Sequence, residues 1–279
     1  MTSAVLLCTS ALMLSAAENS PEPNRLEIYK TIGNVQLKMH IFEPEETGTE
    51  PRPAIVLYFG GGWNGGTPTQ FYPHCRYLAD RGMLAMAAEY RVKSRHGTAP
   101  TECVKDGKSA IRWIRREAER LQVDPHRVVA GGGSAGGHVA AACATVLGFD
   151  DEPDSEISPV PDALVLFNPV YENGPGGYGY DRVKEYCYEI SPLHNIREGI
   201  APAIVFFGTE DNLVPVSTTK RFQSLMHNVG ARSELHLYEG QGHGFFNFGR
   251  SENRFFTDTV KKMDSFLVSL GLLGVPETE

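Results

Sequence analysis

Ser134 lies in a sequence that is typical of a catalytic serine. Residues 127–138 read RVVAGGGSAGGH, in which an apolar stretch leads through glycines to the serine and then to a segment of small residues. A serine on a tight strand-to-helix turn, a nucleophile elbow, needs such neighbours because larger side chains would collide with the strand or the helix. The helix N-terminus behind the serine favours the negative charge that develops when a carbonyl is attacked. The motif therefore predicts that Ser134 is the nucleophile of an acyl-transfer reaction.

A carboxylate partner is predicted from the loop after the apolar stretch 203–208. The loop reads GTEDNLVP, in which Glu210 and Asp211 are adjacent. Catalytic groups of open α/β sheets lie beyond the carboxyl ends of the strands, which is where both residues fall. We favour Asp211 because it fits the usual G-T-x-D-x-x-V-P arrangement of this loop. An aspartate that only caps a turn or a helix is the structural alternative.

The general base is predicted to be His243, which follows the stretch 234–239 in the motif GQGHGF. Glycines on both sides give this histidine a flexible loop from which its ring can reach Ser134. A serine hydroxyl is a poor nucleophile until such a base removes its proton. The order Ser, Asp, His along the chain is the one that accompanies a nucleophile elbow. The chain has nine histidines, and the other eight, His74 and His138 among them, lack this position.

A third glycine-rich motif, FGGGWN at 59–64, is predicted to stabilise the oxyanion that acyl transfer creates. Backbone N–H groups that point at this oxygen lower the barrier of the reaction. They come from the loop after an early strand and from the residue after the nucleophile. We therefore expect the donors to be Gly61, Gly62 and Ala135. A glycine-rich hairpin without a catalytic role is the alternative.

The segment around Ser134 also permits a different interpretation. Gly131, Gly133 and Gly136 form G-x-G-x-x-G between a predicted strand and a predicted helix, which is the pattern of a dinucleotide-binding turn. That function requires an acidic residue at the end of the next strand, about twenty residues further on. The aspartates within 150–154 follow no such strand, so the interpretation is weaker than that of a nucleophile elbow.

The predicted elements place these motifs at one edge of a mostly parallel sheet. Residues 25–42 indicate two antiparallel edge strands, and short apolar stretches then alternate with longer helical patterns, as in sheets with helices on both faces. Further strands are predicted over 54–59, 84–90, 127–131, 163–167, 203–208 and 234–239. Helices are predicted near 69–81, 101–121, 136–146, 216–229 and 253–270.

With these motifs in this order, the chain resembles the α/β-hydrolase fold-3 and acetyl esterase group, including hormone-sensitive-lipase-like esterases and bacterial feruloyl and acetyl xylan esterases. The resemblance covers about residues 25–270 and is carried by FGGGWNGG, GGGSAGGH, GTEDNLVP and GQGHGF. It implies an α/β-hydrolase fold and a serine carboxylesterase with the triad Ser134, Asp211 and His243. Phe59 departs from the H-G-G-G form of the group, which favours the carbohydrate-esterase-like members over lipases.

The stretch between Pro169 and Pro202 is predicted to be a short cap loop over the site. It is rich in glycine and tyrosine, and long loops of this kind on α/β folds often carry binding function. We expect Tyr171 and Tyr178, with Trp63, to bind substrate. Aromatic rings with a polar tip suit sugars or phenolic acids better than a long alkyl chain. The alternative is that such tyrosines only pack the loop onto the domain.

Composition and charge agree with an enzyme that acts on small or carbohydrate esters. The chain has 279 residues, of which 41% are hydrophobic and 22% charged, which fits one packed domain over 18–279. The net charge of −8 gives no indication of a basic surface that could bind phosphate backbones. We therefore do not expect nucleic acid to be a partner. The chemistry implies no metal or organic cofactor. The oligomeric state stays open.

The first 17 residues resemble a signal peptide, with an apolar run followed by small residues up to Ala17. The run is too short to span a bilayer. We therefore expect a secreted or periplasmic protein.

No C-x-x-C pair is present, which weakens a zinc or redox role for the cysteines. Export would permit a disulfide such as Cys75 to Cys103, although the sequence does not assign the pairing.

Three other functions are compatible with part of these patterns. A serine exopeptidase similar to the catalytic domain of prolyl oligopeptidases would use the same triad, but the chain has no room for a propeller domain. A binding protein that retains the fold would keep a pocket without needing all three catalytic groups. A nicotinamide-dependent oxidoreductase would use the glycine-rich turn alone. The ester hydrolase accounts for the most motifs.

Overall fold

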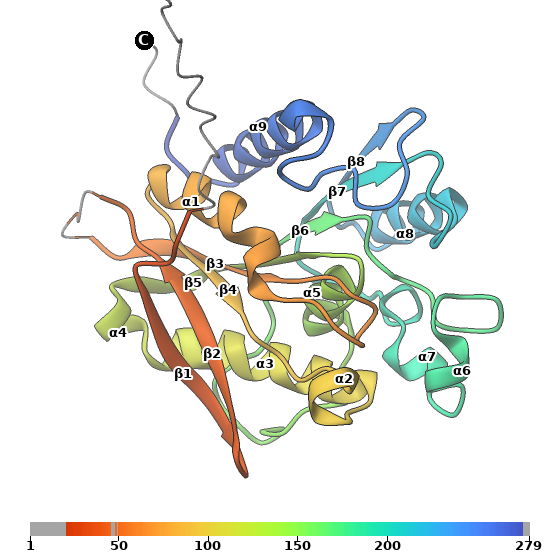
Figure 1. Cartoon of the computed structure of the whole chain (residues 1–279), viewed down its shortest axis with the longest axis horizontal. Helices are drawn as coiled ribbons and strands as arrows, with labels where there is room; N and C mark the ends of the chain where they lie inside the picture. The colour runs from red at the N-terminus through yellow and green to blue at the C-terminus, as the bar shows by residue number, and fades with distance from the viewer. Residues whose placement is uncertain (1–20, 46–47, 49, 276–279) are drawn as a thin grey trace, which may run out of the picture.

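The central sheet contains eight strands in the order β1-β2-β4-β3-β5-β6-β7-β8 (Figure 1). The computed structural model describes residues 21–45, 48 and 50–275, so the predicted signal peptide lies outside the described residues. The pairs β1–β2 and β2–β4 are antiparallel, and the remaining pairs are parallel. The strands are β1 (Arg25–Ile32), β2 (Val35–Phe42), β3 (Arg52–Tyr58), β4 (Leu84–Ala88), β5 (Val123–Gly133), β6 (Ala163–Phe167), β7 (Ala203–Gly208) and β8 (Ser233–Tyr238).

Helices cover both faces of this sheet because its central strands are apolar on both sides. Along β3, alternate residues enter different apolar clusters: Val56 joins one and Leu57 the other. The first cluster is covered by α3 (Pro100–Arg116), α5 (Ala135–Thr145) and α8 (Val216–Asn228). The second is covered by α1 (Tyr72–Asp80) and α9 (Arg254–Ser269), which lie above the sheet in Figure 1. The predicted α/β-hydrolase architecture is therefore confirmed.

The shortest helices are the elements that the sequence does not predict. Four-residue helices lie in connections: α2 (Lys93–His96), α6 (Tyr180–Val183) and α7 (Cys187–Ile190). One turn of helix is too short to show the 3.6-residue periodicity on which the prediction depends. The helix predicted over 101–121 is divided into α3 and α4 (Ala118–Leu121). The described residues also contain three 3₁₀ turns: η1 (Pro68–Phe71), η2 (Pro192–His194) and η3 (Ser251–Asn253).

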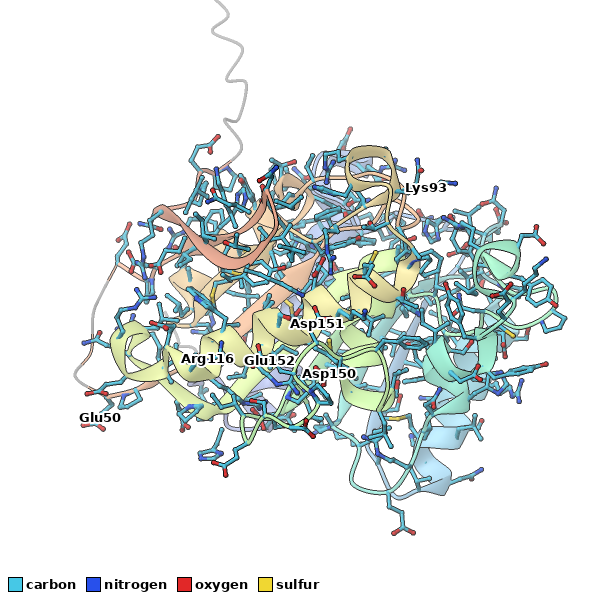
Figure 2. All side chains as sticks on the ribbon, turned by 90° about the horizontal axis from the view of Figure 1, so that it is seen from below. Glu50, Lys93, Arg116, Asp150, Asp151 and Glu152 are labelled. Atoms are coloured by element: carbon cyan, nitrogen blue, oxygen red, sulfur yellow. The ribbon has the colours of Figure 1, made fainter. Side chains whose placement is uncertain are left out.

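Three acidic residues that follow α5, Asp150, Asp151 and Glu152, form ion pairs, which argues against the dinucleotide interpretation. Figure 2 shows Asp150, Asp151 and Glu152 beside helix α3, with Arg116 close by. Asp150 pairs with Arg112 of α3 at 2.5 Å, and Asp151 accepts from Lys30 of β1 at 2.7 Å. These carboxylates fasten the loop after α5 to α3 and β1, so they lie away from the glycine-rich turn.

The four described cysteines are free thiols, and all are buried. The suggested disulfide between Cys75 and Cys103 is therefore wrong. Cys75 lies in the apolar cluster covered by α1 and α9, whereas Cys103 lies in the cluster on the opposite face of the sheet. The sheet itself separates the two sulfur atoms.

The segment predicted as a cap packs mainly against the side of the domain. Val183, Cys187 and Ile190 from α6 and α7 form a small apolar cluster with Val104 of α3 and with Ala142 and Val146 at the end of α5. The prediction of a cover over the site is therefore only partly correct.

No helix in the described part of the chain has both the length and the hydrophobicity that a membrane crossing requires.

Candidate active site

Ser134 lies at the turn between β5 and α5, where its backbone is strained. Its φ is 54° and its ψ is −119°, a combination that residues with a side chain rarely adopt. Close packing explains the glycine two residues later, since a Cβ on Gly136 would lie 1.9 Å from the carbonyl oxygen of Tyr58. The turn has the geometry of a nucleophile elbow and presents the hydroxyl at the carboxyl edge of the sheet.

His243 lies between Ser134 and Asp211 and contacts both. Its Nε2 is 2.8 Å from Oγ of Ser134, and its Nδ1 is 2.7 Å from Oδ2 of Asp211. A carboxylate can only accept, so the ring carries its hydrogen on Nδ1 and accepts the serine hydroxyl at Nε2. In this arrangement the imidazole can take the proton of Ser134 while Asp211 stabilises the imidazolium that results.

Asp211 fixes the turn of its own loop and also contacts His243. Its Oδ1 accepts hydrogen bonds from the N–H groups of Leu213 at 2.9 Å and Val214 at 3.0 Å, which fixes the turn. Its Oδ2 accepts from His243, and its side chain is fully buried. The adjacent Glu210 is exposed. Asp211, and not Glu210, is thus the residue that the structure brings to the histidine.

His74 and His138 are buried and lie apart from the serine hydroxyl. His138 packs edge-on against Trp63, and its Nε2 is 3.0 Å from the carbonyl oxygen of Ile190. Burial lowers the pKa of His138 to about 4 and that of His74 to about 3. Both rings are therefore neutral core side chains near neutral pH.

Asn168 is a polar residue of the site that the sequence analysis did not single out. It follows β6, is fully buried, and has a φ of 32°. Its Oδ1 accepts from the N–H of Gly244 at 3.0 Å, and its Nδ2 lies 3.3 Å from Nε2 of His243. A usable signal was present, because Asn168 is the first polar residue beyond an apolar strand whose carboxyl end lies at the catalytic edge.

The expected oxyanion donors lie beside the serine. Gly61 and Gly62 line the same cavity as Ser134 and have φ values of 123° and 61°, which favour glycine. No backbone carbonyl in the described ranges accepts from either N–H. Ala135 begins α5, so its N–H has no partner within the helix. The N–H of Gly60, in contrast, donates to Oε1 of Gln70 at 2.6 Å.

Gln70 connects this glycine loop to the histidine loop. Besides accepting from Gly60, its Nε2 donates to Oδ1 of Asn247 at 2.9 Å. Asn247 in turn donates from Nδ2 to the carbonyl oxygen of Gly244 at 2.8 Å. An unbroken chain of hydrogen bonds therefore runs from the loop that follows β3 to the residue after His243.

Of the three predicted substrate-binding residues, only Tyr178 lines the cavity. The predictions for Trp63 and Tyr171 are wrong because both side chains are buried in the core. Tyr171 stacks on Phe222 of α8 with ring centroids 4.0 Å apart, and burial raises its pKa. Trp63 packs against Tyr178, with ring centroids 5.7 Å apart, and so supports the residue that lines the cavity.

The cavity beside the triad has a volume of about 500 Å³. Its lining combines glycine backbone and polar side chains with a few apolar groups, among them Leu213 and Phe246. Arg250 is also part of the lining and is exposed. Within the described residues, no three His, Cys, Asp or Glu side chains are grouped so that they could hold a metal ion.

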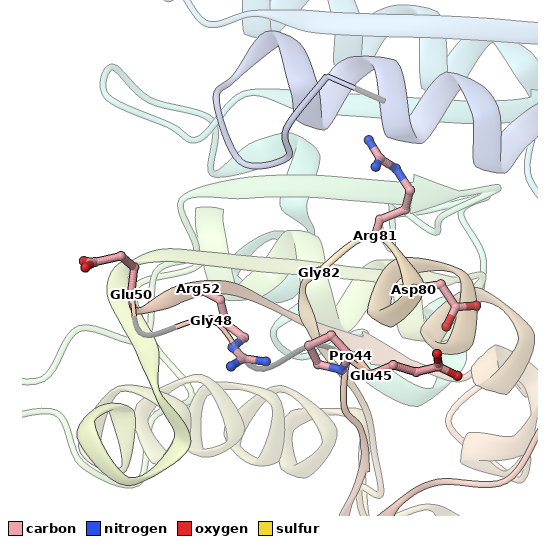
Figure 3. A pocket seen from close by; sticks show the side chains of 8 residues that line it. All are labelled: Pro44, Glu45, Gly48, Glu50, Arg52, Asp80, Arg81 and Gly82. Atoms are coloured by element: carbon pink, nitrogen blue, oxygen red, sulfur yellow. The ribbon is translucent and has the colours of Figure 1, made fainter. Parts of the chain in front are cut away.

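A larger cavity, of about 660 Å³, lies at the other end of the sheet. Figure 3 shows its lining, which includes Arg52 at the start of β3 and Gly82 just before β4. Active sites of open α/β sheets lie at the carboxyl ends of the strands, and this cavity is at the amino ends. The smaller cavity is therefore the candidate site.

Solved structures of an esterase from Thermogutta terrifontis resemble this chain over nearly its whole length. The propionate-bound form has a TM-score of 0.86 at 43% identity and covers 93% of this chain and 98% of its own. A form phosphorylated by paraoxon has a TM-score of 0.85 at 45% identity, covering 90% of this chain and 96% of its own. The chain belongs to the α/β-hydrolase family of serine carboxylesterases. The resemblance proposed from the sequence motifs is thereby confirmed.

Family and curated relatives of this esterase agree with that assignment. Residues 39–160 match the BD-FAE family, and residues 177–267 match the dienelactone hydrolase family. Esterase LipC of Mycobacterium tuberculosis is 25% identical over 74% of this chain and 56% of its own. An acetylxylan esterase of Xylanibacter ruminicola is 27% identical over 86% of this chain and 50% of its own. The chain spans about half the length of these curated relatives.

Proposed function

We propose that Ser134, His243 and Asp211 are the catalytic triad of this esterase and that it hydrolyses esters of short acyl chains. The observation that carries the proposal is the pair of hydrogen bonds on His243, at 2.8 Å to Ser134 and at 2.7 Å to Asp211. Nucleophile, base and orienting carboxylate within hydrogen-bond distance of one another are the geometric requirement of this chemistry.

The proposed reaction has two balanced steps. His243 takes the hydroxyl proton while Oγ of Ser134 attacks the ester carbonyl, and the carbonyl oxygen becomes an oxyanion facing the N–H groups of Gly61, Gly62 and Ala135. When the intermediate collapses, the bond to the alcohol breaks and His243 returns the proton to the departing oxygen. A water molecule, deprotonated by the same histidine, then attacks the carbonyl carbon of the acyl-serine. The bond between that carbon and Oγ of Ser134 breaks, His243 returns the proton to Oγ, and the acid is released.

The proposed preference for short acyl chains has two supports. The cavity is lined by glycines and polar groups and has few aliphatic side chains, which gives a long alkyl chain little apolar surface. The similar Thermogutta terrifontis esterase has been solved with propionate and with butyrate bound. Tyr178 and Phe246 also offer flat surfaces for an aromatic acyl group.

Acetyl groups on carbohydrate are the natural substrates that we propose. One supporting relative is an acetylxylan esterase, at 27% identity. Polar side chains such as Thr67, Thr69 and Gln70 line the cavity and could hydrogen-bond to sugar hydroxyls.

Two measurements test the proposal. Turnover of p-nitrophenyl acetate, butyrate and octanoate, measured beside acetylated xylan and methyl ferulate, compares acyl sizes and substrate classes. We expect octanoate to be the slowest of the three nitrophenyl esters. A fluorophosphonate probe should label the wild-type protein and fail to label Ser134→Ala. Labelling of Ser134→Ala would contradict the triad, and faster turnover of octanoate than of acetate would contradict the acyl preference.

We also propose that residues 1–17 direct export and that cleavage follows Ala17. The support is the apolar run followed by small residues at the start of the chain. Expression of the full chain in a bacterial host, followed by N-terminal sequencing of the protein in each cell fraction, tests this. A protein that stays in the cytoplasm with residues 1–17 intact would contradict it.

A further inference from the structure

Asn168 is placed so that it can act on the same ring nitrogen that accepts the serine proton. Its Nδ2 is 3.3 Å from Nε2 of His243, the atom that also lies 2.8 Å from Oγ of Ser134. The orientation of the amide is determined by its other end, since Oδ1 accepts the N–H of Gly244 at 3.0 Å. The NH₂ group therefore faces the imidazole.

The position of Asn168 is fixed by the backbone as well as by the amide. Its N–H donates to the carbonyl oxygen of Phe206 in β7 at 2.7 Å, and the side chain is fully buried. The preceding residue, Phe167, accepts the N–H of Ser134 at 2.9 Å. Asn168 thus connects the strand end beneath the nucleophile to the loop of the base.

We propose that Asn168 is a positioning residue which holds the His243 loop against Ser134 and, through its N–H donor at Nε2, favours the neutral imidazole that accepts the serine proton. The physical reason is that neutral Nε2 accepts a hydrogen bond, whereas protonated Nε2 is itself a donor. Two N–H groups that face each other repel.

Among the residues that the structure describes, the carboxylate that pairs with the imidazole is that of Asp211. Asp211 contacts Nδ1, on the far side of the ring from Asn168. Glu210 and Arg250 lie on neighbouring loops, and both are exposed to solvent, which screens their charges. A substitution of Asn168 can therefore replace the N–H donor beside Nε2 by an acceptor without changing these charged groups.

Replacement of Asn168 by aspartate separates this function from a merely structural one. Asn168→Asp keeps the shape of the side chain but presents oxygen, and a negative charge, to Nε2. A carboxylate within about 4 Å stabilises the imidazolium. We expect the acid limb of kcat/KM for p-nitrophenyl acetate to move to higher pH by at least about one unit. Asn168→Leu removes both hydrogen bonds and should lower kcat at pH 8 by about tenfold or more.

A matched control is Asn212→Asp, which adds the same charge next to Asp211 but on an exposed side chain. It should move the acid limb much less. The midpoint of a pH profile does not depend on how much of a preparation is folded, so partial misfolding of a variant does not obscure the result. An unmoved acid limb in Asn168→Asp, or an equal shift in Asn212→Asp, would overturn the proposal.

This inference rests on the proposed triad, and the two can fail separately. If Ser134→Ala keeps its activity, the triad itself is wrong. If Ser134→Ala is inactive and Asn168→Asp has the wild-type pH profile, the triad stands and only the role of Asn168 is rejected. The rate of fluorophosphonate labelling against pH gives a second readout that does not depend on deacylation.

Discussion

The guanidinium of Arg182 donates a hydrogen bond to the carbonyl oxygen of Gly62, which joins helix α6 to the loop of the proposed oxyanion donors. The same guanidinium lies over the ring of Trp63, 5.1 Å from its centroid, and over the ring of Tyr178, at 5.6 Å. The segment with α6 therefore contributes to the site by holding the loop of Gly62 and the ring of Tyr178 in place.

Loss of Arg182 should reduce kcat more than it raises KM. In Arg182→Ala the carbonyl of Gly62 loses this restraint, so the N–H of the same residue, one peptide earlier, is held less firmly toward the oxyanion, which forms only during the reaction. We expect kcat for p-nitrophenyl acetate to fall by about tenfold to a hundredfold. Arg197→Ala is the control, because Arg197 also donates to a backbone carbonyl, that of Thr145, but at the end of α5. An equal loss of kcat in both variants would argue against a specific role for Arg182.

The division of roles between Asp211 and Glu210 can be measured directly. Asp211→Asn keeps the shape of the side chain but cannot stabilise the imidazolium of His243, and kcat should fall by about 10³- to 10⁴-fold. Glu210→Gln changes an exposed side chain and should leave kcat within about twofold. Steady-state kinetics of the two variants side by side give the answer. A strong loss of kcat in Glu210→Gln would contradict the assignment of Asp211 as the carboxylate that orients His243.

Gly62→Ala should impair the site through two steric effects. The backbone φ of 61° disfavours any residue with a Cβ, and the new methyl carbon would lie 2.6 Å from the hydroxyl oxygen of Tyr178. We expect a large loss of kcat/KM with little change in overall fold by circular dichroism. Adding Tyr178→Phe removes the colliding oxygen and should restore part of the activity. Activity of Gly62→Ala equal to wild type would exclude a constrained oxyanion loop.

Buried His74 should make the protein less stable in acid. Its ring lies among Phe71, Phe167, Phe246 and Phe256, neither nitrogen has a hydrogen-bond partner in the described structure, and burial lowers its pKa to about 3. The unfolded chain binds a proton at this residue below about pH 6.5, whereas the folded protein does not until about pH 3. The stabilising contribution of neutral His74 is thus complete above about pH 6.5 and decreases as the pH falls toward 3.

Thermal unfolding at several pH values tests this directly. Between pH 7 and pH 5, wild type should lose about 2 kcal/mol through His74, and His74→Phe should be spared that loss. The exposed His126 provides the control, since His126→Gln should follow the wild-type pH dependence. If Tm of His74→Phe falls with pH as steeply as that of wild type, the buried ring is not the cause.

The triad could be predicted from the sequence because each of its residues is marked by local constraints. A strained serine turn excludes side chains at the neighbouring positions, as the contact between Gly136 and Tyr58 shows, so the glycines are visible in the sequence. Asp211 follows the apolar strand β7, His243 follows the neighbouring strand β8, and the topology of a parallel sheet brings the ends of these two strands together.

The roles of the aromatic residues could not be predicted in the same way. Tyr171 and Tyr178 are seven positions apart in one loop, yet one stacks on Phe222 in the core and the other lines the cavity. The difference depends on how a loop without periodicity packs against helices that are distant in the sequence. Asn168 was missed for the related reason that a single polar residue after a strand has no motif of its own.

The chain of hydrogen bonds through Gln70 and Asn247 has a consequence for protein engineering. Its two central residues are 177 positions apart in the sequence, yet they couple the glycine loop to the loop of His243. A swap of either loop from another esterase would break the amide pair unless its partner were exchanged as well. Chimeras of this enzyme should therefore be built by transferring Gln70 and Asn247 together.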